Sequence, residues 1–232
     1  MTQNWQEIWE ARRLDPSRGS VLAQLMAADG LDTGFGSVSE DSWRSFAKRV
    51  ASELSLQPGE SVFEVGCGAG AFLYDFWQRG VAVGGIDRSS SLIGFARDAM
   101  PCGAFSVADA TALDVTGRHD IVLACGVFLY FADLPYAADV IGRMCAKARR
   151  AIAVLDTPDA EKRDAAMGLR RGTMGAAEYE ARYAGLDHLY YAKDWVRDAL
   201  VAGGMSGVRI EDQAIPGYAN AAYRFNAYGF RK

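Results

Sequence analysis

From residue 61 onward, short apolar runs alternate with amphipathic stretches of helical period, and this alternation restricts the folds that the chain can adopt. The apolar runs are SVFEVG, VAVGGID, AFSVAD, HDIVLACG and RAIAVLD. Strands of this kind are buried on both faces, so the pattern predicts an α/β fold with a parallel sheet covered by helices on both sides. Ligands of these sheets bind beyond the carboxyl ends of the strands, where we expect the functional residues.

The two ends of the chain differ from this central part. GVRIEDQAI and AAYRFNAYGF are strand-like and are joined by the turn-forming PGYAN, which predicts a C-terminal antiparallel hairpin and seven strands in all. The N-terminal part is predicted to be helical, with one helix ending at Gly30 and another opened by Ser37 or Ser39. Ser37 has the capping-box spacing to Glu40.

The stretch VFEVGCGAGAF places three glycines directly after the first apolar run. Glycines at a strand end allow the backbone to approach a ligand closely. Gly66, Gly68 and Ala71 satisfy the dinucleotide fingerprint G-x-G-x-x-G/A. Gly66, Gly68 and Gly70, preceded by Glu64, equally suit a loop that holds S-adenosylmethionine. The loop alone leaves both cofactor classes open.

Two acids at strand ends bear on this choice. Asp87 ends the second apolar run, at the distance where an acid binds a ribose diol, and both cofactors carry that diol. Glu64 discriminates between them, because a carboxylate about 4 Å from a pyrophosphate would cost on the order of 4 kcal/mol at an effective dielectric near 20. Beside an ammonium or a sulfonium the same interaction is favourable. The charge of Glu64 therefore favours the cationic ligand.

Four segments resemble the motifs of class I S-adenosylmethionine-dependent methyltransferases of the small-molecule type. They are VFEVGCGAGAF, GIDRSSSLIGFAR after the second strand, VADATALD at the third strand, and HDIVLACGVFLYF at the fourth strand and its active-site turn. The resemblance covers roughly residues 60 to 156, and the final hairpin agrees with the reversed last strand of the family. One departure is structural: AKARR replaces the usual K-P-G-G turn before the fifth strand.

The resemblance implies a Rossmann-like fold in one domain with four parts. Half of the 232 residues are hydrophobic, which is enough for a single core. The parts are a helical N-terminal cap or lid (1–58), a cofactor-binding core (59–156), an acceptor-side insertion (157–190), and the last helix with the hairpin (191–232).

The resemblance also implies S-adenosylmethionine as the cofactor. In this interpretation Asp87 binds the ribose, Arg88 lies along the adenine, and Asp109 contacts the adenine edge. For the glycines, a tight turn alone is the alternative, and for Asp87 a helix-capping acid. The implied cofactor-binding residues are Glu64, Gly66, Cys67, Gly68, Gly70, Asp87, Arg88, Asp109, Ala110 and Cys125.

Aromatic residues are the next candidates. Phe128 and Tyr130 follow the fourth strand, where the family places groups beside the transferred methyl, although both could be ordinary core residues. In the insertion, Tyr179 and Tyr183 are four residues apart and share a helical face, so we expect them to contact the acceptor. The implied lid carries Trp5, Trp9, Phe35 and Trp43, for which a packing stripe is the alternative.

The chain has two histidines, and only one falls on the expected acceptor side. His119 precedes the fourth strand at its amino end and is interpreted as structural. His188 closes the insertion and is the candidate general base, with a hydrogen-bonded packing histidine as the alternative. Arg170 and Arg171 could meet an anionic acceptor or form a solvated charged face.

Composition limits the partners. The formal net charge is −4 without a long run of like charge, so we expect a small-molecule acceptor and neither nucleic acid nor membrane. The four cysteines are scattered, which favours free thiols in a reducing cytoplasm, and we expect no metal. A nicotinamide-dependent oxidoreductase and a catalytically silent binding protein of the same fold are the alternatives. The acceptor and the oligomeric state are left open.

Overall fold

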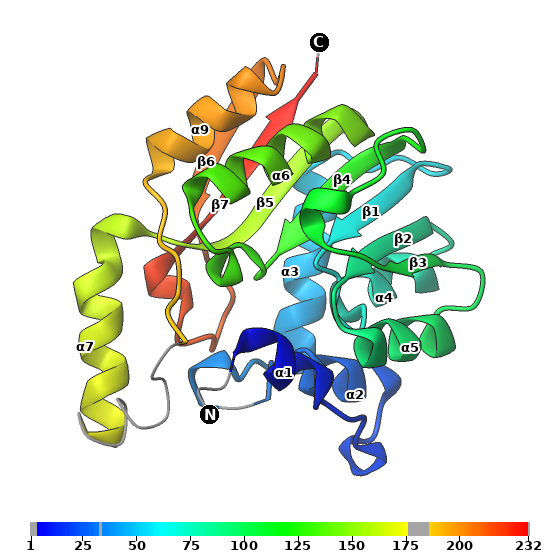
Figure 1. The fold of residues 1–232 in the computed structure, drawn as a ribbon. Coiled ribbons are helices and arrows are strands. Elements are labelled where there is room, and N and C mark those ends of the chain that lie inside the picture. Colours follow the sequence, from blue (N-terminus) through cyan, green and yellow to red (C-terminus); the bar gives the residue numbers. More distant parts are fainter. Residues whose placement is uncertain (1–3, 33, 176–185, 232) are drawn as a thin grey trace.

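The computed structural model describes residues 4–32, 34–175 and 186–231, and it contains a central mixed sheet (Figure 1). Within the described residues the sheet has seven strands in the order β3-β2-β1-β4-β5-β7-β6. The strands are β1 (Ser61–Val65), β2 (Ala82–Asp87), β3 (Ala104–Val107), β4 (His119–Cys125), β5 (Ala148–Pro158), β6 (Gly207–Asp212) and β7 (Arg224–Phe230).

Strands β1 to β5 are parallel, and β7 runs antiparallel to both of its neighbours, β5 and β6. The prediction of a mostly parallel, seven-stranded sheet with a C-terminal antiparallel hairpin is confirmed. The connection between the hairpin strands is longer than the predicted turn, because residues 221–223 form a 3₁₀ turn before β7 begins.

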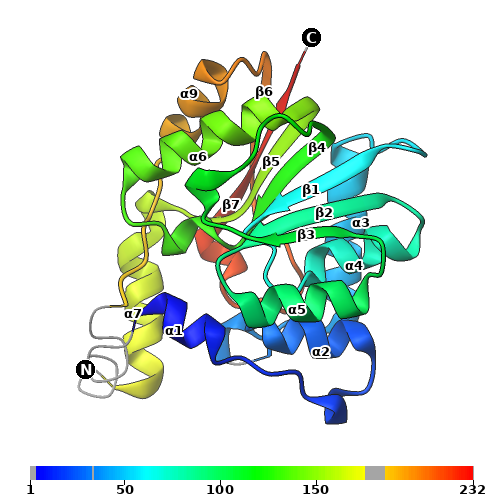
Figure 2. The same cartoon turned by 45° about the vertical axis from the view of Figure 1, so that its right-hand side comes forward.

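Helices cover both faces of the sheet, and the alternation of side chains along β4 separates two cores. Ile121 and Leu123 pack with the helices on one face, and Val122 and Ala124 with those on the other. The first face carries α3 (Glu40–Glu53), α4 (Ala71–Gln78) and α5 (Ser90–Ala99), and the second carries α6 (Leu134–Lys147) and α9 (Lys193–Ala202) (Figure 2).

The N-terminal helices α1 (Trp5–Glu10) and α2 (Val21–Ala28) lie against α5 and α4, at the end of the sheet that carries the glycine loop (Figure 2). Gly30 follows α2 with a φ of +80°, as expected for a helix-terminating glycine. Helix α3 begins after Ser39, whose hydroxyl accepts the Ser42 amide, so the capping box at Ser37 does not form.

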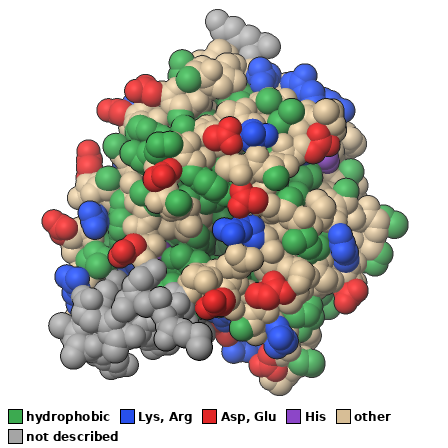
Figure 3. Space-filling view, in the orientation of Figure 1, with side chains coloured by type: hydrophobic (Ala, Val, Ile, Leu, Met, Phe, Trp, Pro, Cys, Tyr) green, Lys and Arg blue, Asp and Glu red, His purple; other side chains and the backbone are tan. Residues whose placement is uncertain are grey.

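After β5 the chain forms helix α7 (Arg163–Met174), which lies beside the 3₁₀ turn of residues 221–223. On the face shown in Figure 3, acidic and basic side chains are interspersed rather than gathered by sign. None of the described helices is long and apolar enough to span a membrane.

Candidate active site

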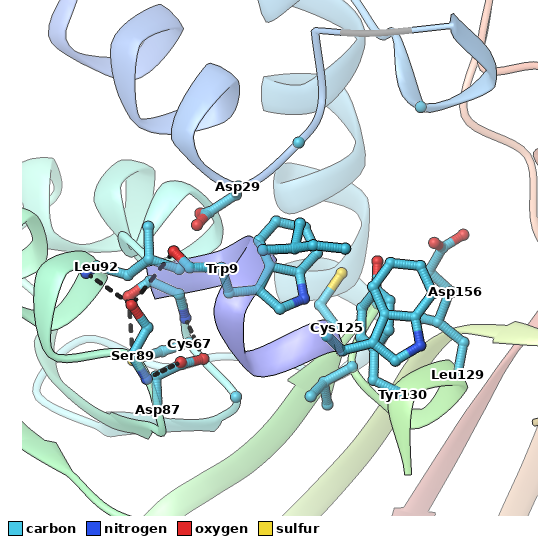
Figure 4. Close-up of a pocket in the computed structure, with 18 of the residues that line it drawn as sticks. Trp9, Asp29, Cys67, Asp87, Ser89, Leu92, Cys125, Leu129, Tyr130 and Asp156 are labelled. Atoms are coloured by element: carbon cyan, nitrogen blue, oxygen red, sulfur yellow. Dashed lines mark hydrogen bonds between the residues drawn. The ribbon is translucent and has the colours of Figure 1, made fainter. Parts of the chain in front are cut away.

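A cavity of about 1340 Å³ opens at the carboxyl ends of the central strands. Figure 4 shows Asp29 and Asp87 toward one end of it, and Cys125, Tyr130 and Asp156 toward the other. Pockets for one small molecule occupy about 300–1000 Å³. The cavity therefore has room for a cofactor and a second ligand.

The glycine loop has a backbone that requires glycine at all three predicted positions, and two of them, Gly66 and Gly68, line the cavity. Gly66 and Gly68 have φ angles of +70° and +53°. A Cβ at Gly66 would lie 2.4 Å from Val127 Cγ2, and one at Gly68 would lie 2.2 Å from Asp29 Oδ1. The loop backbone therefore packs tightly against Val127 and Asp29. Cys67, between the two glycines, also lines the cavity.

Asp29, at the C-terminal end of α2, binds the backbone of the glycine loop. No sequence motif indicated this residue. Its Oδ1 accepts a hydrogen bond from the Ala69 amide at 2.6 Å, and its Oδ2 accepts one from the Ala71 amide at 3.1 Å. Ala71 begins α4, and amides at a helix N-terminus are the groups that bind phosphate in dinucleotide folds. A carboxylate of the chain occupies these amides.

Three buried carboxyl groups, those of Asp29, Glu64 and Asp87, line this end of the cavity. Burial, with repulsion from Asp87, raises the pKa of Asp29 to about 7. Burial and repulsion from the other two acids raise the pKa of Glu64 well above its usual value. Among the described residues, Glu64 Oε2 has no hydrogen-bond partner. A bound cation would offset the repulsion within this cluster.

Asp87 lies at the end of β2, where the sequence placed it. Its Oδ2 accepts a hydrogen bond from the Gly68 amide at 3.0 Å, and its Oδ1 accepts one from the Ser89 amide at 2.8 Å. A carboxylate oxygen accepts two hydrogen bonds, so both oxygens retain capacity for a diol in the cavity.

Arg88 and Ala110 line the cavity, whereas Gly70 and Asp109 are not among its lining residues. Asp109 Oδ1 accepts a hydrogen bond from the Tyr136 hydroxyl at 2.8 Å, and its Oδ2 lies 3.5 Å from Arg88 Nε. Asp109 therefore holds the side chains that border the cavity, and its direct contact with an adenine stays a prediction.

After β4, Cys125 and Tyr130 line the cavity, but Phe128 does not. Phe128 is 1% exposed and packs against Phe131 and Tyr191. The predicted acceptor contact of Phe128 is corrected to a core position, because the 3₁₀ turn directs the rings of Phe128 and Tyr130 to different sides. Burial raises the pKa of the Cys125 thiol well above its usual value, which disfavours a nucleophilic role.

At the end of β5, Asp156 belongs to a buried polar network that the sequence did not reveal. Its φ is +55°, beside a register shift between β5 and β7. Oδ2 accepts hydrogen bonds from the Tyr218 hydroxyl at 2.9 Å and from Arg224 Nη1 at 3.2 Å. The Asn226 side chain accepts the Asp156 amide at 3.0 Å. Arg224 thus balances the charge of Asp156 inside the cavity wall.

His188 contacts three other residues that line the cavity. Its ring stacks on Trp5 with the centroids 5.1 Å apart and meets Tyr130 edge-on at 5.7 Å. Its Nδ1 lies 2.7 Å from Arg170 Nη1. Burial and the charges of Arg170 and Arg224 lower the pKa of His188 to about 2, so the ring is neutral near physiological pH.

The remaining predicted residues lie at different places, and some fall outside the described part of the chain. Trp5, Trp9 and Trp43 line the cavity. Tyr179 and Tyr183 lie outside the described residues. His119 lies at the amino end of β4, with its ring 4.9 Å from that of Phe63. In the part of the chain that the structure describes, no three His, Cys, Asp or Glu side chains are grouped to hold a metal ion.

Comparison with known families identifies the central segment of the chain. Residues 62–155 match the family model described as a methyltransferase domain. The predicted resemblance of the four motifs to methyltransferases is confirmed over this central segment, which contains the glycine loop and strands β1 to β4. Among curated proteins, none matches the chain.

Solved structures of methyltransferases share the fold of this chain. The N-methyltransferase NodS from Bradyrhizobium japonicum, solved with S-adenosylhomocysteine, has a TM-score of 0.64 and 16% identity, with 99% of each chain covered. Magnesium protoporphyrin IX methyltransferase from Synechocystis has a TM-score of 0.59 and 18% identity, covering 82% of this chain and 84% of its own. An amino pentose methyltransferase from Micromonospora echinaspora has a TM-score of 0.62 and 13% identity, covering 82% and 92%.

Proposed function

We propose that the protein transfers a methyl group from S-adenosylmethionine to an oxygen or nitrogen of a small molecule. The observation that carries this proposal is the cluster of Asp29, Glu64 and Asp87 around the glycine loop. These three buried acids outnumber the two arginines that interact with them, Arg12 and Arg88, and so favour a sulfonium and an ammonium and oppose a pyrophosphate. The Asp29 carboxylate, which accepts hydrogen bonds from the Ala69 and Ala71 amides at the start of α4, opposes a dinucleotide in the same way.

The residues present fit the parts of this cofactor. Asp87 would accept hydrogen bonds from the ribose diol, and Arg88 and Ala110 would border the adenine. Gly66 and Gly68 would let the backbone approach the methionine part, with Glu64 near its ammonium. When bound, S-adenosylmethionine supplies an electrophilic methyl group that needs no protein nucleophile. This agrees with the neutral thiol of Cys125.

The chain's own contribution is to hold the acceptor in line, an effect worth up to about 7–11 kcal/mol in well-oriented reactions. The methyl group would pass directly from the sulfur to the acceptor oxygen or nitrogen, and the acceptor's proton would be released to solvent. The hypothesis of a general base at His188 needs a free lone pair facing the acceptor. The Arg170 contact on Nδ1 favours a different role for this ring, as a hydrogen-bond donor.

Isothermal titration with S-adenosylmethionine and with NAD tests the cofactor. We expect saturable binding of the first and none of the second at equal concentration, and the reverse result would favour the oxidoreductase. Turnover is tested by formation of S-adenosylhomocysteine that depends on an added acceptor. If the protein binds S-adenosylmethionine but no compound in a broad panel of candidate acceptors is methylated, the silent binding protein is favoured.

A further inference from the structure

Arginines of the described residues line both ends of the cavity. They are Arg12, Arg88, Arg170 and Arg224. Arg224 donates a hydrogen bond to Asp156, and Arg170 contacts the ring of His188. These four residues, Asp156, Arg170, His188 and Arg224, are the acceptor wall. The two arginines of this wall are therefore engaged by side chains of the same wall.

The other two arginines lie at the cofactor end of the cavity, which carries the acids Asp29, Glu64 and Asp87. The charge of Arg12 opposes the rise in the pKa of Asp29, and the charge of Arg88 opposes the rise in the pKa of Asp87. Each arginine is thus close to one of the acids, and the two differ in their other contacts.

Arg88 is held by two polar side chains. Its Nη2 donates a hydrogen bond to Gln6 Oε1 at 2.8 Å, and its Nε lies 3.5 Å from Asp109. Arg88 directly follows Asp87, the residue that would bind the ribose. Its place is therefore beside the nucleoside part of a cofactor.

Arg12, just after α1, has an open edge. Its Nη1 donates to the Ala27 carbonyl at 3.5 Å and lies 4.0 Å from Asp32, whose closer partner is Arg18 at 2.6 Å. In the part of the chain that the structure describes, Nε and Nη2 of Arg12 form no hydrogen bond. These two atoms share one edge of the planar guanidinium, so two neighbouring N–H groups are available to a ligand.

This open edge lies close to the glycine loop. A Cβ at Gly30 would lie 3.5 Å from Arg12 Nη2, and Gly30 lines the cavity. Gly30 directly follows Asp29, whose carboxylate accepts two amides at the glycine loop. The Arg12 Cζ lies 5.3 Å from the centroid of the Trp9 ring, a cation–π contact that helps to fix the guanidinium.

The methionine part of S-adenosylmethionine carries an ammonium and a carboxylate, and the acids of the cofactor end favour only the first. They would repel the carboxylate unless a cation lies beside it. A guanidinium edge with two N–H groups matches the two oxygens of a carboxylate. Arg12 presents such an edge next to the loop that would hold the methionine part.

We infer that Arg12 binds the carboxylate of the methionine part of S-adenosylmethionine through its Nε–H and Nη2–H groups. The inference rests on the proposed function, because it assigns a residue to the cofactor of that reaction. The N-terminal segment then recognises the amino-acid end of the cofactor. Arg12 thereby determines specificity, since nucleosides that share only the adenine and the ribose lack this carboxylate.

Two ligands that differ in the carboxylate test the inference on the unaltered protein. They are S-adenosylhomocysteine and its decarboxylated analogue S-adenosyl-3-thiopropylamine, which keeps the amine. In a calorimeter we expect S-adenosylhomocysteine to bind at least about tenfold more tightly, as charge-assisted hydrogen bonds require. Equal affinities, or tighter binding of the analogue, would overturn the inference.

The variant Arg12→Gln assigns the effect to this residue. We expect its affinity for S-adenosylhomocysteine to fall at least about tenfold, and its affinity for the analogue to fall no more than about threefold. Arg13→Gln is the matched control, because Arg13 is exposed and donates only to the carbonyls of Glu10 and Arg12. An equal loss for both ligands in Arg12→Gln would make Arg12 a structural residue and refute the inference.

The variant Arg12→Lys carries the same test if the glutamine variant does not fold. It keeps the positive charge but not the two neighbouring N–H groups, so S-adenosylhomocysteine should bind at least about threefold more weakly and the analogue equally well. Wild-type affinity for S-adenosylhomocysteine would contradict the inference. If the wild type binds neither S-adenosylhomocysteine nor S-adenosylmethionine, the proposed function itself fails.

Discussion

At the scale of the residue, Asp29 is the acid whose charge changes near neutral pH. A cationic ligand binds best when the carboxyl is ionised, and the pKa in the empty cavity is about 7. Affinity for S-adenosylmethionine should therefore fall by up to about tenfold per pH unit below this value. Calorimetry from pH 8 to pH 5.5 measures this slope.

The slope should be smaller in Asp29→Asn, and Asp41→Asn, at an exposed position in the first turn of α3, is the control. A slope that is unchanged in Asp29→Asn would assign the titration to another group.

The raised pKa of Asp29 affects the stability of the unliganded protein in the opposite direction: low pH weakens cofactor binding but stabilises the free protein. The folded-state pKa of Asp29 is raised above the usual value of 3.8, so its protonated form is favoured by folding. This contribution is present below about pH 4 and is lost as the pH rises through about 7. The free energy of unfolding, measured with denaturant, should increase from pH 8 to pH 5 by this contribution. The increase should be smaller in Asp29→Asn.

Substitution of Asp87 tests the predicted contact with the ribose. Its two oxygens already accept backbone amides and would also accept the ribose hydroxyls. Because each charge-assisted hydrogen bond contributes about 1.5–3 kcal/mol, Asp87→Ala should weaken S-adenosylmethionine binding at least tenfold. Calorimetry gives the affinity, and the circular dichroism spectrum should stay unchanged. An affinity equal to that of the wild type would remove Asp87 from the site.

At the scale of the element, α1 is held against the N-terminus of α5 by several hydrogen bonds, of which Glu10 makes two with its side chain. Glu10 Oε2 accepts the Ser90 amide at 2.9 Å, and its Oε1 accepts the Ser90 hydroxyl at 2.5 Å. The Ser91 hydroxyl donates to the Glu10 carbonyl at 3.0 Å. These contacts hold Trp9, a cavity-lining residue, over the cofactor end. The lid thus depends on a helix cap supplied from another helix.

Loss of this cap should loosen the lid without unfolding the core. Glu10→Gln should weaken S-adenosylmethionine binding by about three- to tenfold, since a partly exposed helix-end charge contributes about 0.3–1 kcal/mol in addition to its hydrogen bonds. Glu7→Gln, on the same helix, is the matched control. Equal affinities of the two variants would show that α1 does not act through Glu10.

The contrast between elements shows what local sequence can predict. The parallel strands with their C-terminal hairpin, the glycine loop and Asp87 were predictable, because each shows in a short stretch of the sequence. Asp29 was missed because its partners lie 40 and 42 residues further along, in a loop that it meets only in the folded chain. Asp156 and Arg224 were missed likewise, since 68 residues separate them. Phe128 and Tyr130 share one motif, and only the turn geometry separates their roles.

At the scale of the whole molecule, the lid, the loop and the acceptor wall come from distant parts of the chain but enclose one cavity. A ligand that binds only the folded state therefore stabilises all of these parts together, by RT ln(1 + [L]/Kd). At a hundredfold excess over Kd this amounts to about 2.7 kcal/mol, which corresponds to roughly 5–10 °C in Tm for a chain of this size.

S-adenosylhomocysteine at that excess should therefore raise the Tm by this amount, whereas NAD at equal concentration should leave it unchanged. S-adenosylmethionine and S-adenosylhomocysteine both carry the ammonium, and only S-adenosylmethionine also carries the sulfonium. Replacement of Glu64 by Gln should therefore reduce the stabilising effect of both ligands, and that of S-adenosylmethionine more. Scanning fluorimetry of the wild type and Glu64→Gln with each ligand measures the difference. An equal loss for both ligands would mean that Glu64 recognises the ammonium alone, and no loss for either would mean that it does not recognise the charge of the cofactor.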